Sequence, residues 1–261
     1  MPQPVLTYYD VAPNVCAFST TRHGGVSKGN YASLNIHLFQ HDNFYDVHRN
    51  RQILLSELNV QSKDLFMPRQ IHGDKVFNLD KSFLEKPKEQ QEPLLDGIDA
   101  LITNQVQICI GVSTADCVPV LLYDTKNKVS GAVHAGWRGT CLKIVGKTID
   151  EMSHVYGTNP QDIKAVIGPC IRQDAYEVGE DVYDAFQEAH FEMESLTKKM
   201  KNRWHLDLAA ANRDLLCQKG VHDASVFDCG QCTWTNDKDY FSARRLGIDS
   251  GRVYTGIIVR E

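Results

Sequence analysis

The sequence predicts a single domain of mixed α and β structure over residues 1–261, and three observations carry this prediction. Short apolar runs of strand character alternate along the chain with segments whose apolar residues recur at helical spacing. A chain of 261 residues can bury a substantial core. It also contains no internal repeat, no low-complexity tract and no clean linker, so nothing in it marks a boundary between domains.

Apolar runs predict the strands. The first, within residues 14–25, leads into a Gly-Gly turn, and residues 162–171 carry a Gly-Pro pair near their end, as is typical where a strand stops. Two β-rich runs flank "STAD" within residues 99–124. The remaining strands are expected at residues 75–80, 129–136 and 251–261.

Helical spacing predicts the helices. In residues 140–157 five apolar side chains share one face and Gly157 follows, which indicates a helix that ends at this glycine. The five are Leu142, Val145, Ile149, Met152 and Val155. Further helices are expected at residues 44–59, 179–194 and 207–219, the last with Asp207 as its N-cap. Residues 81–96 are polar and charged and contain two prolines, which favours an exposed loop or lid.

Charge and composition exclude several kinds of partner. The net charge is −5, from 28 basic and 33 acidic residues, which argues against non-specific binding of nucleic acid. The first residues lack the features of a signal peptide and no apolar run could span a bilayer, so we expect a cytoplasmic protein without a membrane partner. The eight cysteines are therefore expected as thiols. They are Cys16, Cys109, Cys117, Cys141, Cys170, Cys217, Cys229 and Cys232.

Three short segments share a pattern that suits a metal. "RQIHGDKV" contains His72, "TADCVPVL" contains Cys117 and "AVHAGWRG" contains His134, each beside an apolar run with small or turn residues next to it. Two imidazoles and one thiolate are good zinc ligands, and three protein ligands leave a fourth position for water or substrate. Asp116 either accepts a hydrogen bond from a ligand histidine or caps the turn.

The same three residues allow two other interpretations. One is a buried thiol with two hydrogen-bonded histidines, which the burial tendencies of these residue types favour for any one residue alone. The other is a metal-free cysteine hydrolase with Cys117 as nucleophile and His134 as base. The wide separation of the three residues matches no short metal motif, so spacing does not decide between them.

Several motifs, in the order in which they occur along the chain, resemble those of a known family. From about Thr21 to the C-terminus the chain reads "TRHGGVS", "YASLNI", "QIHG", "TADCVPV", "HAGWRGT", "IGPCI" and "FSARR". In this it resembles the purine nucleoside phosphorylase family long labelled multicopper polyphenol oxidase, or laccase domain. The "CGQC" of residues 229–232 is not part of that family's pattern.

The resemblance implies a fold, an activity and a cofactor. The implied fold is α+β, with mixed β-sheets sandwiched between helices, similar to the catalytic domain of cytotoxic necrotising factor. The implied activity is phosphorolysis of adenosine, inosine and methylthioadenosine, together with deamination of adenosine, so purine nucleosides and phosphate are the expected partners. The implied cofactor is zinc, and its ligands fall on His72, Cys117 and His134.

If phosphate is a substrate, the stretch "GAVHAGWRGT" of residues 131–140 can supply an anion site. Gly136 and Gly139 allow close approach of the backbone, and a helix that begins near Gly139 presents free N–H groups. Arg138 adds a planar fork that fits phosphate. Trp137 packs either against the purine or ribose or into the core.

Five further residues each carry two interpretations. Arg22 either contacts phosphate or caps a turn, and Asn35 either orients another site residue or forms a turn. Cys170 either lines the pocket or is a buried thiol. Arg244 and Arg245 either add positive charge to the site or form a solvated pair.

Other classes of function compete for these residues. A laccase needs a blue-copper centre and a histidine-rich copper cluster, but the ten histidines of this chain include no His-x-His pair. A non-catalytic module would bind zinc without turnover. Residues 190–192, "HFE", followed by "CGQC" imitate a zinc deaminase motif, but Asp228 stands where that motif has proline.

Overall fold

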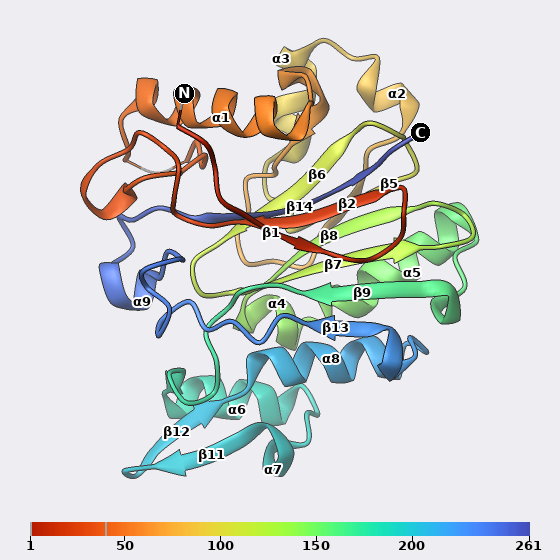
Figure 1. Cartoon of the computed structure of the whole chain (residues 1–261). Coiled ribbons are helices and arrows are strands. Elements are labelled where there is room, and N and C mark those ends of the chain that lie inside the picture. The colour runs from red at the N-terminus through yellow and green to blue at the C-terminus, as the bar shows by residue number, and fades with distance from the viewer. Residues whose placement is uncertain (1, 40) are drawn as a thin grey trace.

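The structure is a computed structural model that describes residues 2–39 and 41–261. Its centre holds two β-sheets that pack against each other (Figure 1). The first sheet has the strand order β1-β2-β14-β6-β3, in which β3 runs parallel to β6 and the other neighbours are antiparallel. Its strands are β1 (Leu6–Tyr9), β2 (Val15–Thr20), β14 (Val253–Val259), β6 (Cys109–Thr114) and β3 (Leu65–Phe66).

The second sheet has the strand order β13-β9-β7-β8-β5-β4. Its two outermost pairs, β13 with β9 and β4 with β5, are parallel, and the inner pairs are antiparallel. Its strands are β13 (Val226–Asp228), β9 (Ile163–Ile167), β7 (Val118–Asp124), β8 (Ser130–Ala135), β5 (Ala100–Thr103) and β4 (Val76–Asn78). Every residue of β7 and β8 is buried, because neighbouring layers cover both faces of these strands.

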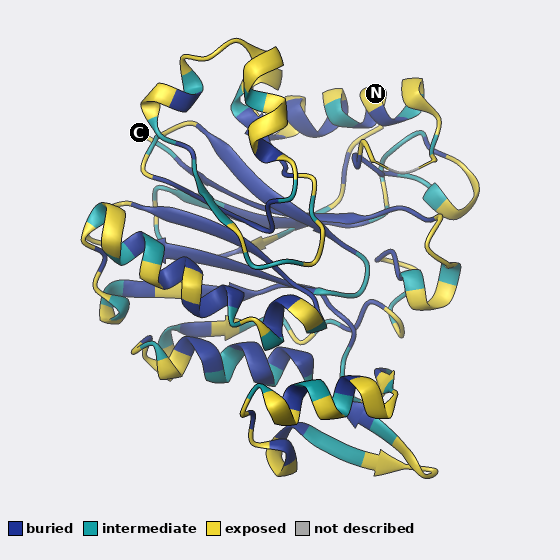
Figure 2. Cartoon of the chain, turned by 180° about the vertical axis from the view of Figure 1, so that it is seen from behind, coloured by how far each residue is buried: buried dark blue, intermediate teal, exposed yellow. Residues whose placement is uncertain are grey.

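Apolar clusters join the layers. Between the sheets, Ile110 and Ile257 of the first pack with Leu121 and Ala132 of the second. The outer face of the first sheet is covered by α1 (Phe44–Leu58), whose Leu54 packs in one cluster with sheet residues. The outer face of the second sheet is covered by α4 (Trp137–Cys141), α5 (Ile144–Tyr156) and α8 (Leu208–Gln218). Figure 2 shows the buried strands between helices whose outer sides are exposed. This arrangement of mixed sheets between helices confirms the expected fold class.

A smaller sheet, β10-β12-β11, lies beyond α8 (Figure 1). It contains β10 (Glu177–Val178), β12 (Arg203–Leu206) and β11 (Thr197–Met200), with α6 (Glu180–Glu188) and α7 (Met193–Leu196) beside it. Three short α-helices complete the described elements of this type: α2 (Lys81–Leu84), α3 (Lys88–Gln91) and α9 (Ala243–Leu246). Short 3₁₀ helices lie at Gly29–Tyr31, Ser62–Asp64, Glu92–Leu95, Pro160–Asp162 and Asp223–Ser225.

The helix expected over residues 140–157 is interrupted. Lys143 has a φ of 61°, in the left-handed region, so the chain forms α4 and α5 instead of one helix. Leu142, beside the break, and Val155, near the end of α5, were expected on the apolar face and are exposed. Gly157 does end α5, with a φ of 69°, as the pattern predicts.

Two other segments differ from expectation, and one cap agrees with it. Residues 81–96 are mostly exposed, but they form short helices, and Phe83 and Leu95 are buried, so they are not an open loop. The helix expected over residues 179–194 breaks near His190, whose φ is 59°, into α6 and α7. Asp207 caps α8 as predicted, because its Oδ1 accepts the N–H of Ala210 at 2.9 Å.

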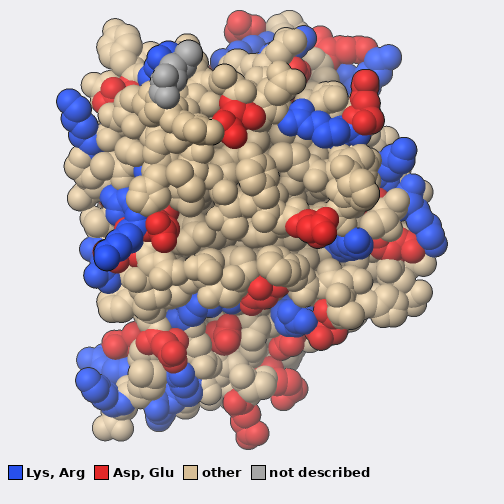
Figure 3. All heavy atoms as spheres, in the orientation of Figure 1, with Lys and Arg blue, Asp and Glu red and all other residues tan. Residues whose placement is uncertain are grey.

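Surface and thiol chemistry agree with the composition. Within the described residues, no helix is both long enough and apolar enough to cross a bilayer. All eight cysteines are free thiols, which confirms the prediction made from the sequence. Acidic and basic side chains are intermixed on the face drawn in Figure 3, with a basic group at the β11–β12 hairpin.

Candidate metal centre and adjoining cavity

His72, Cys117 and His134 converge at one end of the second sheet. Each offers one ligand atom, and these atoms all lie within 4.8 Å of one another. The rings of His72 and His134 meet edge to face with their centroids 4.7 Å apart. The three segments that share a pattern in the sequence therefore form one cluster.

Strand register explains why these residues meet. Cys117 directly precedes β7, and Val118 of β7 pairs with Ala135 of β8, so the antiparallel pairing sets Cys117 beside the end of β8 that carries His134. His72 reaches the same edge from the loop before β4, which lies at the far side of β5 in the sheet.

Asp99, which sequence reasoning missed, organises two of the three residues. It is fully buried directly before β5, and its Oδ1 accepts a hydrogen bond from Nδ1 of His134 at 2.7 Å. Its carboxylate also accepts the backbone N–H groups of Ile71, His72 and Gly73 at 3.2, 2.9 and 2.8 Å. These bonds hold the loop at His72, where φ is 64°. A carboxylate at the start of a buried strand was the available signal in the sequence, because such a charge needs partners.

Asp116, the acceptor considered from the sequence, has other partners. Its Oδ1 accepts from Oγ1 of Thr233 at 2.6 Å and its Oδ2 accepts from the backbone N–H of Arg244 at 2.8 Å. Asp116 therefore anchors the C-terminal segment to the chain at Cys117, while Asp99 orients His134.

The electrostatics of the cluster favour a thiolate. Burial acts to raise the pKa of Cys117, but the charge of His134 and hydrogen bonds from His134 and His72 outweigh it and lower this pKa to about 6. Burial likewise acts to lower the pKa of His134, but Cys117 and Asp99 outweigh it and raise this pKa to about 9. A thiolate is the form of cysteine that binds a metal or attacks as a nucleophile, so both chemistries are available here.

The absence of a side chain at Gly136 leaves room for the side chains of His72 and Cys117. A Cβ at this position would lie 2.9 Å from Cδ2 of His72 and 3.0 Å from Sγ of Cys117. Gly139 is similarly restricted, because its Cβ would lie 2.9 Å from the carbonyl oxygen of Gly73. The backbone at Gly136 is thus close to the ligand cluster and that at Gly139 is close to Gly73, while the approach to an anion expected at both glycines stays a prediction.

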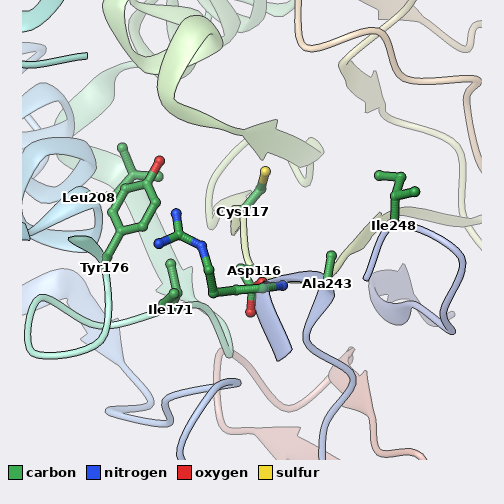
Figure 4. A pocket seen from close by; sticks show the side chains of 8 residues that line it. Asp116, Cys117, Ile171, Tyr176, Leu208, Ala243 and Ile248 are labelled. Carbon is green, nitrogen blue, oxygen red and sulfur yellow. Dashed lines mark hydrogen bonds between the residues drawn. The ribbon is translucent and has the colours of Figure 1, made fainter. Parts of the chain in front are cut away.

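A cavity of about 280 Å³ adjoins Cys117. Figure 4 shows Cys117 between Tyr176 and Leu208 on one side and Ile248 on the other. The lining residues are Asp116, Cys117, Ile171, Tyr176, Leu208, Ala243, Arg244 and Ile248. A mostly apolar cavity with a few polar groups beside a ligand cluster is the usual form of a small-molecule site.

Three arginines expected from the sequence, Arg138, Arg22 and Arg245, do not line this cavity, whereas Arg244 does. The side chain of Arg138 is exposed, and its guanidinium carbon lies 4.1 Å from the ring centroid of Trp137, which itself packs against the core. Arg22 donates to the carbonyl oxygens of Ala32 and Asp237, both at 2.7 Å. Arg245 forms an ion pair with Asp237 at 2.9 Å.

Asn35 and Cys170 are both fully buried. Nδ2 of Asn35 donates to Oδ2 of Asp42 at 2.9 Å, so it stabilises the loop before α1. Burial raises the pKa of Cys170, which does not line the cavity.

The motif that imitates a zinc deaminase does not assemble. Among the residues that the structure describes, His72, Cys117 and His134 are the group of three or more potential ligands close enough to share a metal ion. His190 lies between α6 and α7, whereas "CGQC" follows β13.

Comparisons with known proteins show the family to which the chain belongs. A family model described as multi-copper polyphenol oxidoreductase laccase matches residues 16–260. A protein of Bacteroides thetaiotaomicron named purine nucleoside phosphorylase is 41% identical over 250 residues, which cover 95% of this chain and 93% of that protein. Adenosine deaminase RL5, from an unknown prokaryotic organism, is 40% identical over 243 residues and covers 92% of each chain.

Solved structures agree in fold. The crystal structure of YlmD from Geobacillus stearothermophilus has a TM-score of 0.88 and 31% identity, with 96% of this chain and 94% of that chain covered. A Bacillus licheniformis protein described as hypothetical protein YfiH has a TM-score of 0.90 and 29% identity, with 100% and 97% covered. The chain belongs to the family described as multi-copper polyphenol oxidoreductase laccase, which confirms the resemblance seen in its sequence.

Proposed function

We propose that this protein is a zinc-dependent purine nucleoside phosphorylase that acts on adenosine, inosine and methylthioadenosine and also deaminates adenosine. The observation that carries the proposal is the cluster of His72, Cys117 and His134, whose Cys117 lines a cavity of about 280 Å³. The names of two relatives, purine nucleoside phosphorylase and adenosine deaminase, support the two reactions. We place the enzyme in the cytoplasm, because eight free cysteines suit a reducing compartment.

The residues of the cluster fit one zinc ion. Two imidazoles and one thiolate are ligands that zinc prefers, and the bond from Nδ1 of His134 to Asp99 leaves its Nε2 for the metal. When bound, zinc supplies a Lewis acid that polarises an oxygen or activates a nucleophile near neutral pH. Copper is the less favoured alternative, since a multicopper centre needs more than the one ligand group found among the described residues.

Phosphorolysis sets clear demands on the chain. A phosphate oxygen forms a bond to C1′ of the ribose, the bond from C1′ to the purine nitrogen breaks, and the departing purine takes up a proton. The protein must therefore hold a phosphate anion beside the nucleoside. From the sequence, Arg138 is the proposed phosphate contact, and Gly136 is proposed to let the backbone approach the same anion. The other substrate contacts proposed from the sequence are Arg22, Asn35, Cys170 and Arg245.

Deamination of adenosine uses water instead of phosphate. Water replaces the amino group at C6 of the purine and ammonia leaves, so no anion site is needed. The two proposed reactions therefore share the metal cluster but differ in their dependence on phosphate.

One observation favours a second candidate function. Asp99, His134 and Cys117 form a hydrogen-bonded series, and the pKa of Cys117 is lowered to about 6. A thiolate beside an oriented imidazole is the arrangement of a cysteine hydrolase. Such an enzyme would work without metal, so a metal assay separates the two functions.

The test is to incubate protein of known metal content with each of the three nucleosides, with and without phosphate, and to identify the products by chromatography. The proposal expects free base and ribose 1-phosphate (or the methylthio analogue) only when phosphate is present, and inosine from adenosine in either buffer. Absence of turnover on all three nucleosides by zinc-loaded protein would contradict it. Full activity of zinc-free protein would instead favour the cysteine hydrolase.

A further inference from the structure

The cavity beside Cys117 carries an arginine whose charge is not neutralised by a neighbour. Arg244 lines the cavity, and its Nη1 donates to the carbonyl oxygen of Glu177 at 2.9 Å. Among residues 2–39 and 41–261, no carboxylate oxygen lies within 4 Å of its guanidinium. Its Nε and Nη2 are therefore available to a ligand in the cavity.

Tyr176 offers a second donor on the same wall. It is only 9% exposed, and Figure 4 shows its ring on the cavity wall near Cys117. The guanidinium carbon of Arg244 lies 5.4 Å from the centroid of this ring. The Tyr176 hydroxyl is not among the fully buried polar atoms that lack a partner, and Tyr176 lines the cavity, so this hydroxyl is open to the cavity and can donate to a ligand there.

A backbone hydrogen bond links Arg244, on the cavity wall, to the residue before Cys117. The backbone N–H of Arg244 donates to Oδ2 of Asp116 at 2.8 Å, and Asp116 directly precedes Cys117. Both carboxylate oxygens of Asp116 accept hydrogen bonds, the other from Thr233, and this moderates its negative charge beside the cavity. Arg244 is thus held at a fixed place relative to the proposed zinc ligand.

We propose that Arg244 and Tyr176 bind the phosphate co-substrate in the cavity beside Cys117. The proposal rests on the phosphorylase function proposed above. A guanidinium fork and a phenol are donors that match the oxygens of inorganic phosphate, and an arginine fork can bind two of them at once. Their role is to hold phosphate for attack on C1′, while the purine leaves with the electron pair of the broken bond and a proton.

This proposal differs from the assignment based on the sequence, which puts phosphate on Arg138. Arg138 does not line the cavity, and its guanidinium lies over Trp137. Arg22 and Arg245 donate to carbonyl groups or pair with Asp237. Among the arginines considered, Arg244 is the one that combines a place on the cavity wall with unused donors.

The experiment measures phosphate binding separately from turnover. Zinc-loaded wild type, Arg244→Gln, Tyr176→Phe and Arg138→Gln proteins are titrated with inorganic phosphate and followed by ³¹P NMR. Kinetics then give the KM for phosphate, the KM for inosine and the rate of adenosine deamination in phosphate-free buffer. Arg49→Gln is the matched control, because Arg49 is exposed on α1, on the outer face of the other sheet.

Arg244→Gln is expected to weaken phosphate binding and raise the phosphate KM by roughly ten- to a hundredfold, the effect of losing a charge-assisted pair of bonds. Tyr176→Phe should weaken both by roughly two- to tenfold, the value of one neutral hydrogen bond. The KM for inosine and the deamination rate should change little, and Arg49→Gln should match the wild type. A purely structural role would instead depress phosphorolysis and deamination together.

Three results would overturn the proposal. The first is an unchanged phosphate affinity in both Arg244→Gln and Tyr176→Phe, and the second is an equal loss of phosphorolysis and deamination. The third is a wild-type protein that binds no phosphate, whatever its nucleoside products. If the wild type binds phosphate through Arg244 but releases free ribose, the binding site stands and the phosphorylase function fails. If only Arg138→Gln loses phosphate binding, Arg138 is the phosphate contact, as the sequence suggested.

Discussion

Asp99 accepts a hydrogen bond from Nδ1 of His134 at 2.7 Å, and the same carboxylate accepts the backbone N–H of His72 at 2.9 Å. One buried residue therefore orients two of the three candidate ligands, although they are far apart in the sequence. The bond to His134 selects the nitrogen that faces Cys117, and the bond to His72 holds a loop with a left-handed backbone.

Asp99→Asn should weaken zinc binding by roughly ten- to a hundredfold, as is usual when a partner of a metal ligand is lost. The asparagine amide carries no negative charge to stabilise the His134 ring. It also has only one acceptor oxygen, whereas the carboxylate of Asp99 has two. Competition with a chromogenic chelator measures the effect. Asp124→Asn is the control, because Asp124 is also a fully buried acceptor of backbone N–H groups but lies at the opposite end of β7. Equal zinc affinities for both variants would show that Asp99 is only a structural residue.

Gly136→Ala should expel zinc from a folded protein. The new methyl group would lie 2.9 Å from His72 and 3.0 Å from the sulfur of Cys117, so the ligands must separate. Gly131→Ala, in the strand β8 that ends directly before Gly136, is the comparison, since its Cβ would meet side-chain atoms of Leu122 and Met152 at 3.3 Å or more. Elemental analysis should find zinc in Gly131→Ala and little in Gly136→Ala. Full zinc content in both would disprove the steric argument.

Cys117 should react rapidly with iodoacetamide at pH 7 in zinc-free protein and slowly when zinc is bound. Its pKa of about 6 lies below the ordinary value, so the thiolate predominates at pH 7, whereas burial raises the pKa of Cys109 and leaves that thiol protonated. The rate for Cys117 should fall as the pH drops below 6. Mass spectrometry of the modified peptides measures both rates, and equal rates with and without zinc would mean that Cys117 is not a ligand.

Thiol titration of denatured, unreduced protein should find all eight cysteines free. The structure pairs none of them, including Cys229 and Cys232, which are separated by only two residues. Six titrating thiols in place of eight would indicate a disulfide and an oxidising environment.

The sequence predicts those parts of the molecule that local patterns encode. The apolar runs of β7, β8 and β14 and the capped ends of α8 and α5 are of this kind, because strand and helix periodicity and cap residues act over a few positions. The grouping of His72, Cys117 and His134, which the structure contains, was one of several interpretations of the local pattern and was implied by the family resemblance. That the chain forms one domain, and that it resembles the toxin domain, stay predictions.

Features that depend on tertiary contacts could not be predicted. The break at Lys143, where the backbone is left-handed, divides a continuous apolar pattern that gives no local sign of it. In the short strands β10, β11 and β12 apolar and polar residues alternate only weakly. These strands are defined by their pairing, β10 with β12 and β11 with β12, which the sequence does not reveal. Asp99 acquires its role only through segments that are distant in sequence, so it did not stand out from its neighbours. Arg244 was considered only together with Arg245, because local sequence does not show which of the two lines the cavity.

The central claim is that phosphorolysis takes place at the His72, Cys117 and His134 centre with zinc bound. Its most direct test is to strip the protein of metal, return zinc in steps, and measure ribose 1-phosphate formed from inosine and phosphate after each addition. The account predicts that activity is absent without metal, rises linearly to one zinc per chain and then stays constant, and that Cys117→Ala protein gains none. Full activity before zinc is returned, or the same recovery in Cys117→Ala, would contradict it.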